Sequence, residues 1–291
     1  MSTKVALGSL PVTFRFRSRS RLLGILLLLP LALVTAFFFV YPMLFLLWRG
    51  LHTAEGLSLR HYLAILSDAR YRQSLVNSVT LSAVVTVASM VLSTTLAFFF
   101  ARYDFPGKRL FKALLTFPLS FPGVVVGFMI IILFGRTGVI PMVAMRIVGR
   151  PLFNIAYTLA GLFVAYLYFE IPRVTLTMIA SVQKMDRRLE EASRSLGAAG
   201  FQTLIYVTLP AIWPALISAS ALAFATSMGA FGTAFTLAQN FNILPMLIYT
   251  EYTMSFNIEM ASAMAVFLGA ITLALLAVYR SWGQGRGRSS A

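Results

Sequence analysis

Stretches without a charged residue constrain this chain more than any other feature of its sequence. An α-helix needs about 20 apolar residues to cross a bilayer. Five charge-free stretches reach about that length: Leu22–Trp48, Gln73–Ala101, Ala113–Gly135, Pro151–Phe169 and Met260–Tyr279. A sixth, Ser195–Thr250, is longer than one span needs. Because Pro210 and Pro214 interrupt it, we expect a single span there at about Trp213–Leu237.

The composition agrees with a membrane protein, because 59% of the residues are hydrophobic and only 11% are charged. Soluble domains carry about 25% charged residues. The alternating pattern of a membrane β-barrel is absent, so we expect an all-α bundle of six transmembrane helices. The first stretch is too long for a signal peptide and is interpreted as a retained span. The absence of cysteine excludes disulfide frameworks and cysteine nucleophiles.

The positively charged residues predict the orientation of the spans. With six spans both termini lie on one side, and 17 of the 24 Lys and Arg residues fall on that side, against 7 on the other. The positive-inside rule then places both termini in the cytoplasm. Cytoplasmic tails of residues 1–21 and 281–291 would flank a span domain of residues 22–280. The net charge of +15 is dispersed over loops and span ends, which indicates attraction to membrane lipid rather than to nucleic acid.

The segments between the spans carry few residues that are suited to binding a metal ion or a nucleotide. His52 and His61 lie in the first outer segment without a cluster of carboxylates, so plain surface residues are favoured over a metal site. Val139–Val148 and Met246–Tyr252 are expected as short helices at the outer interface. The phosphate-binding pattern G-x-x-x-x-G-K-[ST] is absent, so the sequence predicts no such nucleotide site.

Residues 184–210, between the fourth and fifth spans, have the pattern of an exposed amphipathic helix. Asp186 is placed to cap the helix, and Glu190 and Glu191 are favourable near the positive end of its dipole. Gly197 and Gly200 allow the chain to leave the helix and turn. One small apolar face follows the i, i+3, i+4, i+7 spacing, with Leu189, Ala192, Ser193 and Leu196. Such a face is suited to docking in a groove on another protein.

This segment closely resembles the EAA loop of permeases from binding-protein-dependent ABC importers. The family pattern is E-A-A, three residues, Gly, nine residues, Ile, one residue and Leu-Pro. The chain matches it with Glu191-Ala192-Ser193, Gly197, Val207, Leu209 and Pro210. Ser193 replaces the second Ala and Val207 replaces Ile. The position between the fourth and fifth of six spans matches as well. We call residues 184–210 the EAA-like loop.

The resemblance implies the permease fold of a type I importer: a transport subunit, not an enzyme, in the inner membrane of a bacterial cell. It implies two partner ATPase subunits that bind ATP and Mg²⁺, and no cofactor in this chain. It also implies a second permease, with a heterodimer favoured, and a periplasmic or lipid-anchored solute-binding protein. The first span would reach across to the other permease. The residues that would couple to the ATPase are Glu190, Glu191, Ala192, Ser193, Leu196, Gly197, Val207, Leu209 and Pro210.

The transported solute is indicated only by two weaker likenesses. The segments Met228–Thr233 and Tyr249–Tyr252 look like those of polyamine, ferric-ion, sulfate and aminophosphonate systems. On that basis polyamine or aminophosphonate is favoured over an inorganic ion.

Two features lie inside the expected spans. Glu170 is the one acid expected inside a span. Arg173 lies three residues later, and the two residues are expected toward the cytoplasmic end of the span. A local ion pair between them is therefore favoured over a role of Glu170 as a solute ligand, by about two to one. The fifth span carries a stripe of small or hydroxylic residues at helical spacing, formed by Ser218, Ala221, Ala225, Gly229, Gly232 and Thr236. Close helix packing explains such a stripe. Lining of the translocation pathway, which the resemblance implies for this span, is an equally weighted alternative.

An ion-coupled secondary transporter and an integral-membrane enzyme are the alternatives to the importer permease. An ion-coupled secondary transporter would need several intramembrane ionisable residues or an internal repeat, and the sequence has one such acid and no repeat. An integral-membrane enzyme would need clustered acids, histidines or a nucleophile near the bilayer surface. Both alternatives are therefore disfavoured.

Overall fold

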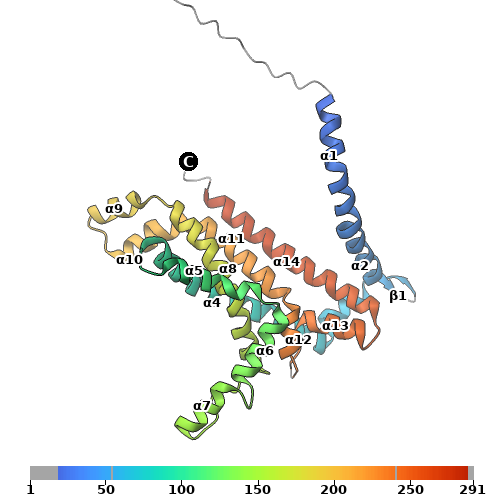
Figure 1. Cartoon of the computed structure of the whole chain (residues 1–291). Coiled ribbons are helices and arrows are strands. Elements are labelled where there is room, and N and C mark those ends of the chain that lie inside the picture. The colour runs from blue at the N-terminus through green and yellow to red at the C-terminus, as the bar shows by residue number, and fades with distance from the viewer. Residues whose placement is uncertain (1–18, 54, 240, 288–291) are drawn as a thin grey trace, which may run out of the picture. The chain divides into compact units, whose positions relative to one another are not determined.

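The computed structural model describes residues 19–53, 55–239 and 241–287 (Figure 1). The chain divides into two compact units, Met1–Trp48 and Arg49–Ala291, which are described separately. The first unit contains α1 (Arg19–Thr35), the π-helical turn η1 (Ala36–Val40) and most of α2 (Tyr41–Leu51).

Six helical segments of the described chain are long and apolar enough to cross a membrane, as predicted. They are Leu27–Leu51, Ala69–Arg102, Gly123–Val148, Leu159–Lys184, Gly200–Met228 and Ile258–Tyr279. The sequence therefore predicted the number of spans correctly, although several of their ends lie elsewhere.

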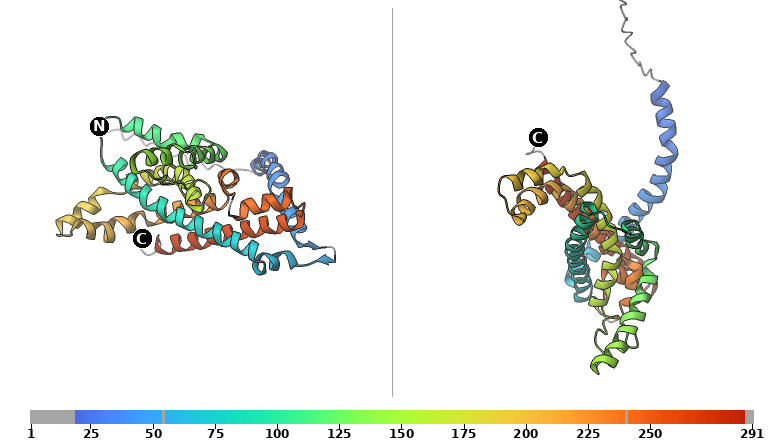
Figure 2. Two further views of the ribbon diagram at one scale, coloured as in Figure 1. Left: turned by 90° about the horizontal axis from the view of Figure 1, so that it is seen from below. Right: turned by 60° about the vertical axis from the view of Figure 1, so that its left-hand side comes forward.

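Four long helices form the body of the second unit. They are α4 (Ala69–Arg102), α8 (Leu159–Lys184), α11 (Leu209–Met228) and α14 (Ile258–Gly287). Helix α4 packs along both α8 and α11, and α14 packs along α11 (Figures 1 and 2). The buried face of α4 is rich in serine, which lets neighbouring backbones approach closely. Ser93, for example, donates a hydrogen bond to the Ile171 carbonyl of α8 at 3.0 Å.

Shorter elements join these helices. They are β1 (His52–Thr53), β2 (Gly56–Leu57), α3 (Arg60–Ser67), α5 (Lys108–Thr116), η2 (Phe117–Ser120), α6 (Gly123–Phe134), α7 (Val139–Val148), α9 (Arg187–Ser195), α10 (Gly200–Thr203), the π-helical turn η3 (Leu204–Thr208), α12 (Phe231–Leu237) and α13 (Leu244–Thr253). The two strands pair antiparallel. Within this unit α9 and α10 project from one end of the bundle, whereas α12 and α13 lie toward the other end (Figures 1 and 2).

The two expected interfacial helices are present as elements. Helix α7 has the predicted bounds Val139–Val148. Helix α13 covers the predicted Met246–Tyr252 segment, but it is packed against α14 and α4, with Leu244, Leu247 and Glu251 buried.

The fifth span was predicted too late in the chain. The helix runs without interruption from Gly200 to Met228, across both Pro210 and Pro214. Proline normally breaks a helix because it lacks an N–H and its ring clashes with the carbonyl four residues earlier. Here the π-helical turn η3 ends at Thr208, and Pro210 is the second residue of α11. π-Helical turns of this kind accompany prolines and bends in long helices. The chain then leaves the helix at Gly229, so α12 is a separate element.

The third and fourth spans also differ from prediction. Helix α6 begins at Gly123 rather than near Ala113, because Pro122 caps it and the 3-10 turn η2 comes before it. Helix α8 begins at Leu159 and continues to Lys184, 15 residues beyond the expected end at Phe169. At the C-terminus, α14 continues to Gly287, so the helix extends into the predicted tail of residues 281–291.

Candidate functional site

The helical first part of the EAA-like loop, at Asp186–Gly197, folds as its sequence predicts. Asp186 caps α9, and its carboxylate accepts a hydrogen bond from the Arg188 backbone N–H at 3.0 Å. Gly197 follows the helix with φ of +87°, a left-handed conformation that costs other residues about 1–2 kcal/mol. Gly200 differs, because it begins α10 and has no positive φ. The turn at the end of α9 therefore depends on Gly197, and the predicted role of Gly200 in it was wrong.

The outer face of α9 exposes apolar side chains. Leu189 is 51% exposed and Leu196 is 89% exposed, while Ala192 is also exposed and Ser193 is half-buried. At 89% exposure, little of the Leu196 side chain is covered by the rest of the described chain. Three of the four residues of the predicted small apolar face are thus exposed, and Ser193 is partly covered.

The two neighbouring acids of α9 have different environments. Glu191 is exposed. Glu190 is half-buried, lies 3.0 Å from Arg102 at the end of α4, and accepts a hydrogen bond from Thr208 of η3 at 2.9 Å. Ser193 and Thr203 also lie within hydrogen-bond distance, at 3.2 Å. Glu190 therefore holds the loop onto two spans, and Glu191 is the acid left facing outward.

The remaining residues of the motif lie where the loop re-enters the bundle. Val207 belongs to η3, and Leu209 and Pro210 begin α11. The motif therefore continues into the span without a break. Between α4 and α5, the Lys108 ammonium donates a hydrogen bond to the Asp104 carboxylate at 2.7 Å. This contact holds the pKa of the exposed Asp104 carboxyl below its usual range.

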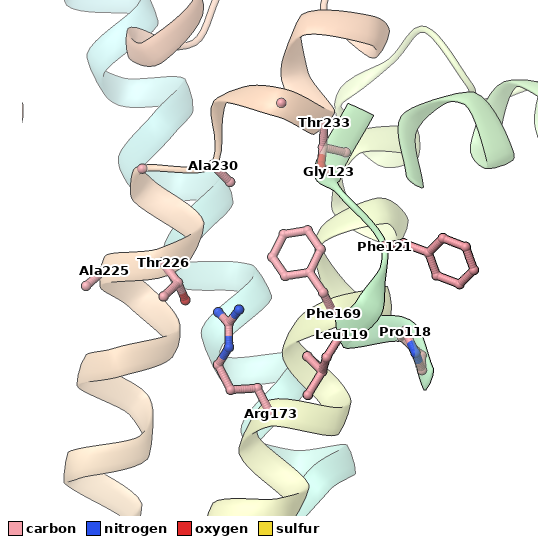
Figure 3. A pocket seen from close by; sticks show the side chains of 12 residues that line it. Pro118, Leu119, Phe121, Gly123, Phe169, Arg173, Ala225, Thr226, Ala230 and Thr233 are labelled. Carbon is pink, nitrogen blue, oxygen red and sulfur yellow. The ribbon is translucent and has the colours of Figure 1, made fainter. Parts of the chain in front are cut away.

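An open cavity of about 450 Å³ lies among α8, α11, η2, α6 and α12. We call it the Arg173 cavity. Its lining is mostly small, aromatic or hydroxylic, and consists of Pro118, Leu119, Phe121, Gly123, Phe169, Arg173, Ala225, Thr226, Gly229, Ala230, Gly232 and Thr233. Figure 3 shows Arg173 reaching from α8 toward Thr226 of α11. Arg173 is the one charged residue in this lining.

The ion pair predicted for Glu170 and Arg173 is present, with an Nη1–Oε1 distance of 3.0 Å. The Thr226 hydroxyl donates to the same carboxylate oxygen. The pair lies in the middle of α8, not toward its end as predicted, because the helix extends 11 residues beyond Arg173. The Glu170 side chain is fully buried, whereas that of Arg173 is 34% exposed.

The predicted stripe does not lie on one helix. Ser218, Ala221 and Ala225 belong to α11, Gly229 ends it, and Gly232 and Thr236 belong to α12. Three members, Ala225, Gly229 and Gly232, line the Arg173 cavity, while Ser218 is exposed elsewhere on α11. Thr236 is buried so close to α6 that a Cβ on Gly127 would overlap its side chain. The stripe thus divides into a cavity-lining part and a packing part, with Ser218 in neither.

A second buried acid was not anticipated. Glu251 of α13 is 3% exposed and lies 3.2 Å from Arg70, and it accepts a hydrogen bond from Tyr71 at 3.4 Å. Both partners belong to the start of α4. The sequence did offer a signal for this buried acid, namely a carboxylate within a strongly apolar helix. The hydrophobic pattern alone did not show that α13 is packed inside the bundle.

The histidines show no metal site. His61 Nδ1 lies 3.2 Å from the Gly50 carbonyl, and His52 is exposed. Within the described residues, no three His, Cys, Asp or Glu side chains are grouped so that they could hold a metal ion.

Residues 93–285 match the family model described as binding-protein-dependent transport system inner membrane component. This match covers well over half of the chain and includes the whole EAA-like loop and the Arg173 cavity. The chain belongs to this family. It is therefore a multi-pass permease subunit of an ABC importer, as the resemblance implied, and its relatives are transport subunits rather than enzymes.

Several named permeases are similar in sequence. Sulfate permease 2 of the Chlamydomonas reinhardtii chloroplast is 32% identical over 214 residues, which cover 72% of this chain but only 57% of the relative. The molybdenum transport system permease protein ModB of Escherichia coli K12 is 30% identical over 195 residues, which cover 64% of this chain and 81% of the relative. The putrescine transport system permease protein PotI of the same strain is 29% identical over 248 residues, covering 82% and 85%.

Solved importer structures share the fold of this permease. A bacterial ABC transporter that imports the acidic polysaccharide alginate gives a TM-score of 0.78 at 16% identity, over 91% of this chain and 96% of that chain. The MetNI methionine transporter gives a TM-score of 0.54 at 16% identity, over 75% of this chain and 99% of that chain. The predicted type I importer fold is thus confirmed.

Proposed function

We propose that this permease forms a translocation pathway with a second permease in a bacterial inner membrane and admits a small charged solute by alternating access. A heterodimer is favoured, and a periplasmic or lipid-anchored binding protein delivers the solute. Two ATPase subunits bind ATP and Mg²⁺ and supply the energy. The importers in the MetNI and alginate structures are described as ABC transporters, one of them in complex with a periplasmic protein.

The observation that carries this proposal is the uncovered face of α9. Leu189 within the nine-residue helix α9 and Leu196 directly after it are exposed, as is the acid Glu191. A short amphipathic helix with exposed leucines is the form in which helices dock into grooves of partner proteins. The ATPase subunit is the partner that fits, because the family divides transport and ATP hydrolysis between chains.

An ion-coupled secondary transporter is less well supported by the described residues. Such a protein needs carboxylates that can exchange partners with ions during transport. Glu170 and Glu251 are both buried and paired with arginine. Neither carboxylate is open to an incoming ion.

The coupling role is tested by Gly197→Val and Glu191→Lys in the complete importer, reconstituted in proteoliposomes with its binding protein. Valine at Gly197 is strained at a φ of +87°, and lysine at position 191 reverses the outward charge. Neither residue lies within a membrane-spanning helix. We expect both chains to insert and to pair with the other permease, while loaded binding protein no longer stimulates ATP hydrolysis.

Gly200→Ala is the matched control, since a Cβ there meets nothing within 4 Å and the backbone is not left-handed. It should retain normal stimulation. Normal stimulation in all three variants would show that the loop merely connects two spans and would refute the docking role.

A further inference from the structure

The Arg173 cavity lies at the depth of the bilayer. Arg173 is preceded by 14 residues of α8 and followed by 11. At about 1.5 Å per residue, it is roughly 16–21 Å from either end of the helix. An arginine at such a depth is costly to place in a membrane and usually serves an ion or substrate path.

The charges around the cavity are arranged asymmetrically. The Glu170 carboxylate is fully buried behind the cavity wall, whereas 34% of the Arg173 side chain is exposed. The guanidinium is held in place by Glu170 at 3.0 Å and by the Phe169 ring, whose centre lies 5.9 Å away. A solute in the cavity would therefore meet a positive charge and no exposed negative one.

The rest of the lining supplies groups that hydrogen-bond to an anion. Thr233 carries a hydroxyl, whereas the Thr226 hydroxyl already donates to Glu170, and Gly229 and Gly232 add backbone that no side chain covers. Arginine presents five donors in a planar fork, of which the contact to Glu170 uses only part. A volume of about 450 Å³ accommodates a small oxyanion with water around it.

We infer that Arg173 is an anion-selecting residue of the translocation pathway and that the solute is a small oxyanion, of the sulfate, molybdate or phosphonate class. This inference rests on the proposed importer function. Glu170 is a positioning residue that aims the guanidinium into the cavity. A polyamine is disfavoured in this cavity, because its ammonium groups would face Arg173 while the Glu170 carboxylate is buried and paired.

A purely structural account competes with this one: Arg173 would serve only to neutralise Glu170. The double variant Glu170→Gln/Arg173→Gln separates the two accounts. It leaves no buried unpaired charge, so it assembles even where Arg173→Gln alone does not. If Arg173 only neutralises Glu170, the double variant transports like the unmodified chain. If Arg173 binds the solute, the double variant remains defective.

The experiment uses the complete importer in proteoliposomes with labelled sulfate, molybdate, methylphosphonate and putrescine as probes. We expect ATP-dependent uptake of an oxyanion. In Arg173→Gln and in the double variant, that uptake should fall about tenfold or more, as expected for loss of a charged hydrogen bond. ATP hydrolysis stimulated by loaded binding protein should stay within about twofold of normal, because the EAA-like loop is untouched. Arg173→Lys should raise KM, since the point charge remains and the planar fork is lost.

Arg146→Gln removes an exposed arginine from α7, outside the cavity, and serves as the matched control with unchanged uptake. Oxyanion uptake by the double variant at the unmodified rate would overturn the inference, as would uptake of putrescine alone. No ATP-dependent uptake of any probe by the unmodified importer, together with no stimulation of ATP hydrolysis by any of them, would instead count against the proposed importer function. These outcomes are distinguishable.

Discussion

Glu190 of α9 and Arg102 at the end of α4 form an ion pair, with 3.0 Å between Oε2 and Nη2. Their side chains are only 17% and 15% exposed. The same carboxylate also accepts the hydrogen bond from Thr208. A loop whose outer face is uncovered is thus fixed at its inner face to the second and fifth spans, so displacement of α9 by a partner must move those spans.

Arg102→Gln should loosen this link, because Glu190 would lose its cation and keep the hydrogen bond from Thr208. We expect a loss of about 1 kcal/mol in the free energy of unfolding of the detergent-solubilised permease. We also expect ATP hydrolysis to continue with reduced solute uptake per ATP. Thermal unfolding and the uptake-to-hydrolysis ratio measure the two effects.

A double-mutant cycle of Arg102→Gln with Glu190→Gln isolates the ion pair. The losses in the free energy of unfolding of the two single variants should not add in the double variant. Arg188→Gln, on the exposed part of the same helix, should change neither quantity. Additive losses in the cycle would mean that the contact contributes nothing to the link.

Gly127→Ala should weaken the packing of α6 on α12. A Cβ at Gly127 would overlap the buried Thr236 side chain, and overpacking of this kind costs about 1–3 kcal/mol. Gly269→Ala, in α14 with nothing within 4 Å of its Cβ, should be neutral or stabilising by up to about 1 kcal/mol. Thermal unfolding of both variants gives the comparison, and equal melting temperatures would contradict the close packing.

Single cysteines should distinguish the two parts of the predicted stripe, since the chain has no cysteine of its own. Ala225→Cys lines the Arg173 cavity and should react with a membrane-impermeant thiol reagent at a rate that changes with nucleotide. Thr236→Cys is buried against α6 and should be protected in every state. Protection at both positions would leave helix packing as the sole role of the stripe.

Arg70→Ala should destabilise the second unit by leaving the buried Glu251 carboxylate without its cation. Loss of a fully buried partner costs about 3–5 kcal/mol. Because the Arg70 side chain is 49% exposed, we expect about 1–2 kcal/mol here. Arg72→Ala, two residues later and exposed, is the matched control. In the double variant Arg70→Ala/Glu251→Gln, which removes the unpaired charge, most of the loss should be recovered in thermal unfolding, and no recovery would refute the pairing.

The amino-acid sequence by itself determined the class of the protein, the number of spans and the form of the EAA-like loop. The class follows from the resemblance of the EAA-like loop to a known family, and the other two properties follow from local chemistry. Charge-free stretches cross a bilayer, Asp186 caps the helix that follows it, and Gly197 ends that helix through a left-handed turn. The pair of Glu170 with Arg173 was predictable for the same reason, since the two residues are one helical turn apart.

Only the tertiary structure decided which groups meet across helices and where the spans end. Glu190 and Glu191 are adjacent acids, yet one pairs with Arg102 and the other faces outward, because α4 and η3 lie on one side of α9 only. Helix α11 ends at Gly229, so the stripe that looked continuous in the sequence lies partly along the Arg173 cavity and partly in the packed interior. In a membrane, apolar patterns show that a segment is helical but not which neighbour it contacts, because lipid and helix present equally apolar surfaces.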